Sequence, residues 1–265
     1  MRLSLNHVHF ISLNLQAVHL VYMRDGLWTY AMQSHDLGST WSEPVNISAS
    51  THFIGMHAAS GPPGGVQLPS GRIAVCLSGD IMGESGVVKR SYALMSDDHG
   101  ATWRSGFPVP MPDNSYGSEC QLALLGGERL AMVMKGALAG VNGRLVSTSE
   151  NGGETWANAT LAQTLQPSTP CEGSVVGNPA ASVLYTSLPH SNRGRFNMSI
   201  FSSSDCGKSW QSLAEQYSGP SFYSSLAMSP DRRTLFNLFN LFDEPGWPNP
   251  PDGNRGGLAL TRLDI

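Results

Sequence analysis

Three polar residues open predicted β-strands, and their chemistry is complementary. Tyr223 follows a Gly-Pro pair, Glu119 follows the turn-rich stretch 112–117, and Arg195 follows a glycine. A carboxylate can take the proton of a neighbouring phenol, and a guanidinium can hold a carboxylate through paired hydrogen bonds. If the three strands converge on one axis, Tyr223 and Glu119 should face each other, with Arg195 close enough to share a bound carboxylate. We further expect burial beside Arg195 to favour the charged form of Glu119 and to ease deprotonation of the phenol.

Each of these residues also has an ordinary interpretation when taken alone. A strand tyrosine such as Tyr223 usually packs in a core, Glu119 could be a solvated strand end, and Arg195 could form a surface pair with Arg193. His57, in a Gly-Pro-rich region, is interpreted as a loop histidine. The surrounding elements must therefore decide between the two interpretations.

An eight-residue motif, S-x-[DN]-x-G-x-[ST]-W, organises the chain. It occurs at 34–41, 96–103, 149–156 and 203–210. Asp or Asn can close a turn by bonding the backbone two residues on, Gly permits a positive φ, and Trp can anchor the returning strand. The carboxylates of these boxes are therefore interpreted as turn-forming groups, not catalytic ones.

The spacing of the boxes predicts the architecture. Apolar strand-like segments precede the boxes, for example 28–32 and 196–201, and the copies lie roughly 53 to 62 residues apart. A repeat of this size with about four strands is typical of a β-propeller blade. Strands at 222–228, 235–242 and 257–263 supply a further blade, so the chain holds about five, the first and last of them incomplete.

Composition agrees with an all-β protein and excludes other classes. The 265 residues include 29 Gly and 17 Pro, only 14% are charged, and the net charge is −4, which argues against a nucleic-acid binder. No apolar run approaches the ~18 residues needed to span a bilayer. The N-terminal region alternates like two strands, at 9–15 and 18–22, and has no clear signal-peptide core.

The cysteines and the glycosylation sequons are less informative. The four cysteines, at 76, 120, 171 and 206, lack metal-ligand spacing, and their pairing cannot be read from the sequence. Three Asn-x-Ser/Thr sequons, at Asn46, Asn158 and Asn197, favour a secretory or lysosomal route, while the compartment itself stays unknown.

Five stretches between the boxes resemble the exo-α-sialidase (neuraminidase) family, whose repeats are called Asp-boxes. They are Gly-Pro-Pro-Gly-Gly-Val-Gln-Leu at 61–68, Ser-Glu-Cys-Gln-Leu at 118–122, Cys-Glu-Gly-Ser-Val-Val at 171–176, Arg-Phe-Asn-Met-Ser at 195–199 and Ser-Gly-Pro-Ser-Phe-Tyr-Ser-Ser-Leu at 218–226. The resemblance implies a six-bladed propeller that removes terminal sialic acid from glycoproteins, glycolipids or oligosaccharides without a metal or organic cofactor. Sialidases use a tyrosine nucleophile.

The resemblance assigns roles residue by residue. Tyr223 occupies the place of the nucleophile and Glu119 that of its activating base. Arg195 fits the third of the family's three carboxylate-binding arginines. The place of the second arginine holds Lys135, which keeps the charge but loses the bidentate fork. A hairpin turning at 126–127 would independently set Lys135 opposite Glu119 or its neighbour.

Other parts of the family pattern are not found in the sequence. The first arginine, in an F/Y-R-I-P stretch, and the aspartate acid/base have no match, and Arg24 and Asp25 correspond to nothing catalytic. The place of a late glutamate holds Phe239 or Asn240. The chain, taken as one domain over 1–265, is therefore expected to be N-terminally incomplete, without the first blade.

The sequence thus favours an exo-α-sialidase-like glycoside hydrolase acting on sialylated glycans. The alternative is a non-catalytic Asp-box propeller that binds such glycans or serves as an interaction scaffold, and a third option is a truncated product that cannot close its ring. Because unpaired blade edges invite association, self-association is also expected.

Overall fold

A computed structural model describes the backbone of residues 5–13, 17–25, 28–52, 59–83, 86–166, 171–242 and 256–265, and their side chains except for 5–13 and 59–63. His57 and the loop at 244–255 lie outside the described residues. The regular secondary structure of the described chain is β-strand, apart from the short 3-10 turns η1 (Ser48–Ser50) and η2 (Gln163–Leu165). No helix in these ranges is long and apolar enough to cross a membrane.

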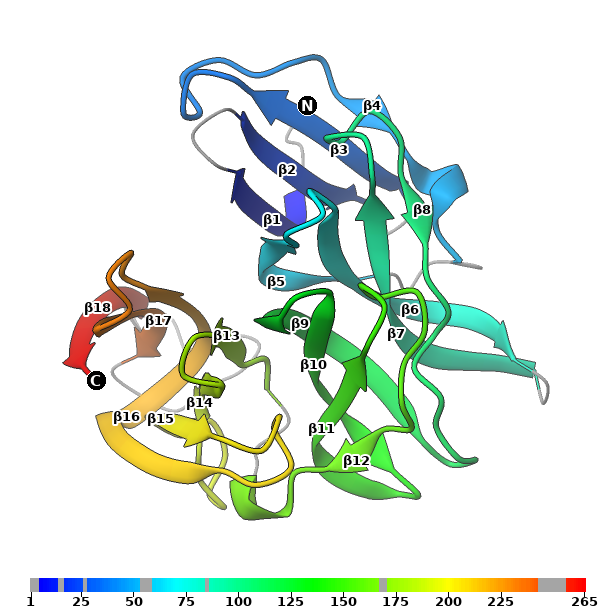
Figure 1. Cartoon of the computed structure of the whole chain (residues 1–265). Helices are drawn as coiled ribbons and strands as arrows, with labels where there is room; N and C mark the ends of the chain where they lie inside the picture. The colour runs from blue at the N-terminus through cyan, green and yellow to red at the C-terminus, as the bar shows by residue number, and fades with distance from the viewer. Residues whose placement is uncertain are drawn as a thin grey trace.

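The strands form consecutive antiparallel sheets that follow one another around an axis (Figure 1). The first sheet contains β1 (Leu5–Leu13), β2 (Ala17–Arg24), β3 (Trp28–Ser34) and β4 (Val45–Asn46). The second contains β5 (Ala59–Gln67), β6 (Ile73–Gly83), β7 (Gly86–Ser96) and β8 (Arg104–Ser105). The third contains β9 (Tyr116–Gly126), β10 (Arg129–Leu138), β11 (Val141–Ser149) and β12 (Thr160–Leu161). Each is a four-stranded blade, so the expectation that the first blade present would be incomplete was wrong.

The last sheet joins a blade to part of another. It contains β13 (Ser174–Asn178), β14 (Val183–Pro189), β15 (Phe196–Ser203), β16 (Gln211–Met228), β17 (Thr234–Phe242) and β18 (Gly256–Asp264). Strand β16 changes partner midway: it pairs with β15 up to Pro220 and with β17 from Ser221 onward. Tyr223 therefore lies inside one long strand and does not open a new one, as the Gly-Pro pair had suggested. The predicted strands at 235–242 and 257–263 are confirmed to within one residue.

The hydrophobic core lies between neighbouring sheets. Val21 of the first blade packs with Leu77 of the second, and Met95 of the second packs with Met132 of the third. Two further clusters lie between the third blade and the β13–β15 segment and between that segment and β16–β18. This layered, all-β arrangement is the predicted sialidase-type propeller.

The boxes form the turns that the sequence predicted, with longer reach than expected. In the second copy, Asp98 accepts hydrogen bonds from Ser96 Oγ (2.8 Å) and from the backbone N–H of Thr102 (2.8 Å), four residues on, not two. Gly100 has φ of +84° and donates its N–H to Ser96 Oγ (2.7 Å). Trp103 donates its indole N–H to the Gly100 carbonyl (3.1 Å) and is buried. The hydrogen bonds of the Asp98 carboxylate thus lie within the turn. This supports the interpretation of the box aspartates as structural residues.

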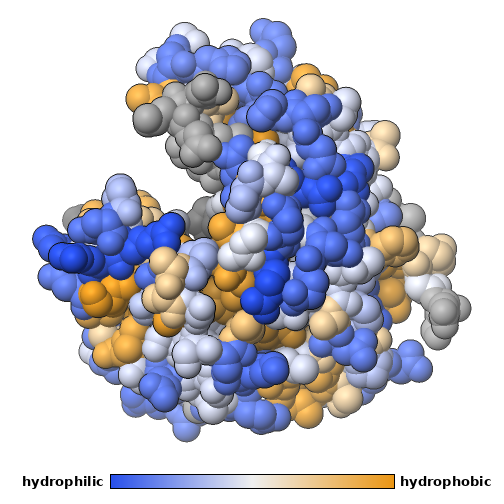
Figure 2. Space-filling view, in the orientation of Figure 1, coloured by the Kyte–Doolittle hydropathy of each residue, from blue (hydrophilic) through white to orange (hydrophobic). Residues whose placement is uncertain are grey.

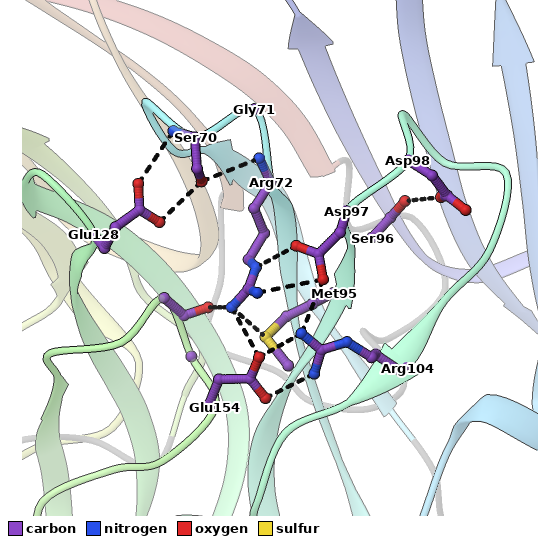
Figure 3. Close-up of polar contacts among 12 residues, drawn as sticks. Ser70, Gly71, Arg72, Met95, Ser96, Asp97, Asp98, Arg104, Glu128 and Glu154 are labelled. Carbon is purple, nitrogen blue, oxygen red and sulfur yellow. Dashed lines mark hydrogen bonds and ion pairs between the residues drawn. The ribbon is translucent and has the colours of Figure 1, made fainter.

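A network of ion pairs between surface side chains joins the second and third blades (Figure 3). Arg72 bonds Asp97 (2.6 Å) and Glu154 (3.1 Å), and Arg104 bridges the same two carboxylates. Hydrogen bonds from the arginines lower the pKa values of Asp97 and Glu154. These charged groups pair with one another, so they stabilise the contact between the second and third blades and form no candidate site.

The β16–β18 segment carries an exposed apolar face. Phe236, Leu238, Leu258 and Leu260 are 37%, 41%, 68% and 68% exposed, and Leu238 is the cross-strand partner of Leu260. In the space-filling view the molecule is notched between this segment and the N-terminal sheets (Figure 2). A propeller blade normally buries such a face against the next blade.

Candidate active site

Tyr223 and Glu119 meet between β16 and β9. The Tyr223 hydroxyl donates a hydrogen bond to Glu119 Oε1. Glu119 is only 8% exposed and lies on the innermost strand of the third blade, while β16 supplies Tyr223 from the other side of the β13–β15 segment. The structure therefore brings together the two side chains that the sequence paired.

Lys135 holds the other oxygen of the same carboxylate. Its Nζ lies 2.8 Å from Glu119 Oε2. Gly126 and Gly127 both have positive φ and form the β9–β10 turn, which returns β10 beside β9. A β-bulge between Met134 and Gly136 sets Lys135 opposite this end of β9, as the hairpin argument predicted. The position of Lys135 is thus confirmed, and its observed partner is Glu119.

Burial makes the Tyr223 phenol hard to ionise. Desolvation raises the pKa of Tyr223 far above its usual value, and the negative charge of Glu119 raises it further. The expectation that its surroundings would ease deprotonation was therefore wrong for this state. The phenol is the hydrogen-bond donor at rest, and its proton already points at the carboxylate that could accept it.

Arg195 lies beside the Tyr223 strand. It directly precedes β15, and its carbonyl accepts the N–H of Ser221 (2.9 Å), which fixes its backbone against β16. Its guanidinium lies over the Phe222 ring, 5.0 Å from the ring centre. Arg195 therefore contacts Phe222, the residue before Tyr223. That Arg195 binds the same substrate carboxylate near Tyr223 and Glu119 stays a prediction.

Two buried charged residues were missed by the sequence reasoning. Arg144 on β11 is the cross-strand neighbour of Lys135 and is 1% exposed; it donates a hydrogen bond to the Cys171 carbonyl (2.5 Å). Glu172 is also 1% exposed and accepts the backbone N–H of Ser224 (3.0 Å). The strand around Arg144, Val-Asn-Gly-Arg-Leu-Val-Ser-Thr-Ser, is mostly polar and gave no signal that this arginine is buried. The stretch that contains Glu172 was noticed only because it resembles the family.

A disulfide supports the strand that carries Glu119. Cys76 on β6 is bonded to Cys120 on β9, the residue after Glu119, and both are buried. This bond ties the second blade to the third directly behind the site. Cys171 and Cys206 are free thiols.

The residues set aside by the sequence reasoning stay outside the site. Arg24 and Asp25 form a contact of 3.5 Å with each other at a hairpin. Phe239, near the place of the family's late glutamate, is 2% exposed and packs near Tyr217. A buried phenylalanine cannot serve as a charged partner for an arginine.

Comparison with known proteins shows which family the chain belongs to. A model of the BNR repeat-like domain matches residues 6–236. Human Sialidase-4 is 33% identical over 183 residues, which cover 62% of this chain and 36% of that protein. A sialidase from Micromonospora viridifaciens is 29% identical over 228 residues, covering 80% of this chain and 33% of its own length.

A solved structure gives the same fold. The Hadza microbial sialidase Hz136 superposes with a TM-score of 0.73 at 23% identity, over 89% of this chain and 50% of that one. The chain thus spans about a third to a half of the length of these relatives. It belongs to the BNR repeat-like domain family and is a relative of the sialidases.

Proposed function

We propose that the chain carries the core of a sialidase active site, with Tyr223 as nucleophile and Glu119 as its base. The observation that carries the proposal is the hydrogen bond from the Tyr223 hydroxyl to Glu119 Oε1, with Lys135 on the other oxygen. The substrate class is a glycan ending in sialic acid, whose anomeric carbon bears a carboxylate.

The chemistry explains a phenol in this position. An anionic nucleophile would be repelled by the substrate carboxylate, whereas the resting phenol is neutral and stays so because burial raises its pKa. As the phenolic oxygen bonds to the anomeric carbon, its proton passes to Glu119 and the bond to the leaving oxygen breaks. The leaving group departs as its anion and takes a proton from solvent. Water then attacks the same carbon, the bond to the Tyr223 oxygen breaks, Glu119 returns its proton to that oxygen, and the proton released by the water passes to solvent.

Arg195 and Lys135 are proposed to bind the substrate carboxylate. Arg195 offers a planar fork beside the Tyr223 strand, and its place over Phe222 fixes the direction of its side chain. Lys135 offers a point charge, which at rest is shared with Glu119. As Glu119 takes the phenol proton and becomes neutral, the attraction of Lys135 to Glu119 weakens and its attraction to the bound substrate carboxylate strengthens.

A substrate with an acidic leaving group provides the test, because such a group departs without a proton donor. We expect the chain to hydrolyse an aryl sialoside that releases a fluorescent phenol faster than an alkyl sialoside, and Tyr223→Phe to remove most of this turnover while retaining binding of a 2,3-dehydro sialic acid. Full turnover by Tyr223→Phe would contradict the assignment.

The second candidate, a propeller that only binds sialylated glycans, predicts a different result. It requires binding of the 2,3-dehydro sialic acid by the unaltered chain without release of the fluorescent phenol. The direct contact between Tyr223 and Glu119 favours the enzyme, since recognition of a glycan alone does not require a phenol donating to a buried carboxylate.

A further inference from the structure

Glu172 is a buried carboxyl group that the proposed chemistry does not use. It lies just before β13, between the strand that carries Glu119 and the strand that carries Tyr223, and it is 1% exposed. Because a buried carboxyl group is costly unless it is hydrogen-bonded, its contacts indicate what it does.

One oxygen of Glu172 holds the Tyr223 segment. Glu172 Oε2 accepts the backbone N–H of Ser224, the residue after Tyr223, at 3.0 Å. The pairing of β16 with β17 is irregular between Ser221 and Ser224, so the sheet ladder alone does not fix Tyr223. The side chain of Glu172 supplies a fixed point directly beside this irregularity.

The other oxygen reaches the Glu119 strand. Gln121 Nε2 lies 3.5 Å from Glu172 Oε1, and Gln121 is two residues after Glu119, on the same face of β9. Gln121 in turn accepts hydrogen bonds from Ser174 Oγ (2.9 Å) and from the N–H of Val175 (2.8 Å). The two strands are therefore joined through one buried polar cluster.

We infer that Glu172 is a positioning residue, which holds the Tyr223 segment of β16 in register with the Glu119 segment of β9 so that phenol and carboxylate meet. The inference rests on the proposed roles of Tyr223 and Glu119. The segment that carries Glu172 is closely packed: a Cβ on the next residue, Gly173, would lie 2.7 Å from the Arg144 guanidinium and 2.8 Å from the Ser187 carbonyl, so a side chain would not fit there.

The charge of Glu172 fits this role. Burial raises the pKa of Glu172 to about 8, although the backbone bond from Ser224 and the charge of Arg144 act in the opposite direction. The other ionisable groups that face it are Glu119, Lys135, Cys171 and Tyr223. At neutral pH the group is a neutral acid, so it places no second negative charge beside Glu119 or beside an anionic substrate.

Two substitutions separate positioning from simple packing. Glu172→Gln keeps an oxygen for the Ser224 N–H, whereas Glu172→Ala removes it; Glu154→Gln, in the surface network, is the control. The readout is the ¹³Cζ resonance of Tyr223 in tyrosine-labelled protein, assigned by its absence in Tyr223→Phe. This measurement needs no substrate, so it is independent of whether the chain hydrolyses sialosides.

We expect the Tyr223 resonance to be retained in Glu172→Gln and Glu154→Gln. In Glu172→Ala it should move toward the value of a solvated tyrosine, with at least a tenfold loss of aryl-sialoside turnover. A folded Glu172→Ala with an unchanged resonance would overturn the inference. If the alanine variant does not fold, Glu172→Met takes its place, because methionine fills a similar volume but offers no oxygen to the Ser224 N–H. A displaced Tyr223 resonance is expected in Glu172→Met, and an unchanged one would overturn the inference.

The pH dependence of stability gives a second readout. Between about pH 5 and 8 the native state keeps the Glu172 proton that the unfolded chain, with a reference pKa of 4.5, has released. Wild-type stability should therefore fall as the pH rises through this range and level off above about 8, and Glu172→Gln should lack this decline. Identical pH profiles would show that Glu172 is already charged at pH 7 and would refute its role as a neutral acid.

Discussion

The Tyr223 hydroxyl donates to the Glu119 carboxylate across 104 residues of sequence. The contact joins the third blade to the strand that starts the last, partial one, so it depends on how the β13–β15 segment packs between them. The phenol is protonated and partly buried, and Lys135 holds the other oxygen of the Glu119 carboxylate. This resting state fits the proposed transfer of the proton at the moment of attack and does not favour a stable phenolate.

Replacing Lys135 by arginine tests how the substrate carboxylate is held. Lys135→Arg adds a fork that can contact Glu119 and a bound carboxylate together. We expect several-fold tighter binding of a sialic acid analogue that carries the carboxylate and no change for one that lacks it, measured by calorimetry. An equal gain for both ligands would show that Lys135 does not contact the carboxylate.

The box aspartates should govern stability in acid. Hydrogen bonds from the side chain and backbone of Thr102, with a further one from Ser96, lower the pKa of Asp98 to about 2. The stability that this shift provides is present above pH 4 and is lost as the pH falls toward 2. Asp98→Asn should retain the turn but lose this pH dependence, because Asn151 makes the corresponding bonds to Thr155 in the third box.

Asp98→Ala should lose the turn itself and lower the melting temperature at pH 7 by a few degrees, as expected for a lost side-chain turn bond in a protein of this size. Thermal denaturation of both variants from pH 2 to 7 provides the measurement. Reduced ligand binding by Asp98→Ala at unchanged stability would show that the box has been assigned to the wrong role.

The exposed apolar face should drive self-association. Leu258 and Leu260 project from β18 and are each 68% exposed, next to Leu238. We expect the chain to sediment as a concentration-dependent mixture, and Leu258→Lys with Leu260→Lys to shift it toward monomer. Val141→Lys, an exposed apolar position on β11, is the matched control. A monodisperse wild-type monomer would rule out association through this face.

The repeat made most of the fold predictable. Each box fixes a turn through contacts within eight residues, so it can be recognised without knowledge of the tertiary structure. The course of β16 was not predictable, because a Gly-Pro pair is typical of a turn and only the partners β15 and β17 keep the chain extended through Pro220. The Cys76–Cys120 disulfide could not be predicted from the sequence either, because it depends on how two blades pack.

The candidate site was predictable where the sequence carried a recognisable pattern. Tyr223, Glu119, Arg195 and Lys135 lie in such stretches, and the structure brings the first two and Lys135 into direct contact. Glu172 could not be singled out, because its importance arises from contacts to Ser224 and Gln121 on other strands. The same dependence on packing explains why the direction of the Tyr223 pKa shift was predicted wrongly: burial raises this pKa, and the negative charge of Glu119 raises it further.

Covalent trapping on Tyr223 is the most direct test of the central claim. A fluorinated sialosyl fluoride, whose added electron-withdrawing fluorine slows hydrolysis of the glycosyl–tyrosine bond, should label the chain once, and peptide mass spectrometry should place the added mass on Tyr223. The label should be absent from Tyr223→Phe and strongly reduced in Glu119→Gln. Labelling of a different residue, or binding of the probe without any covalent label, would contradict Tyr223 as the nucleophile.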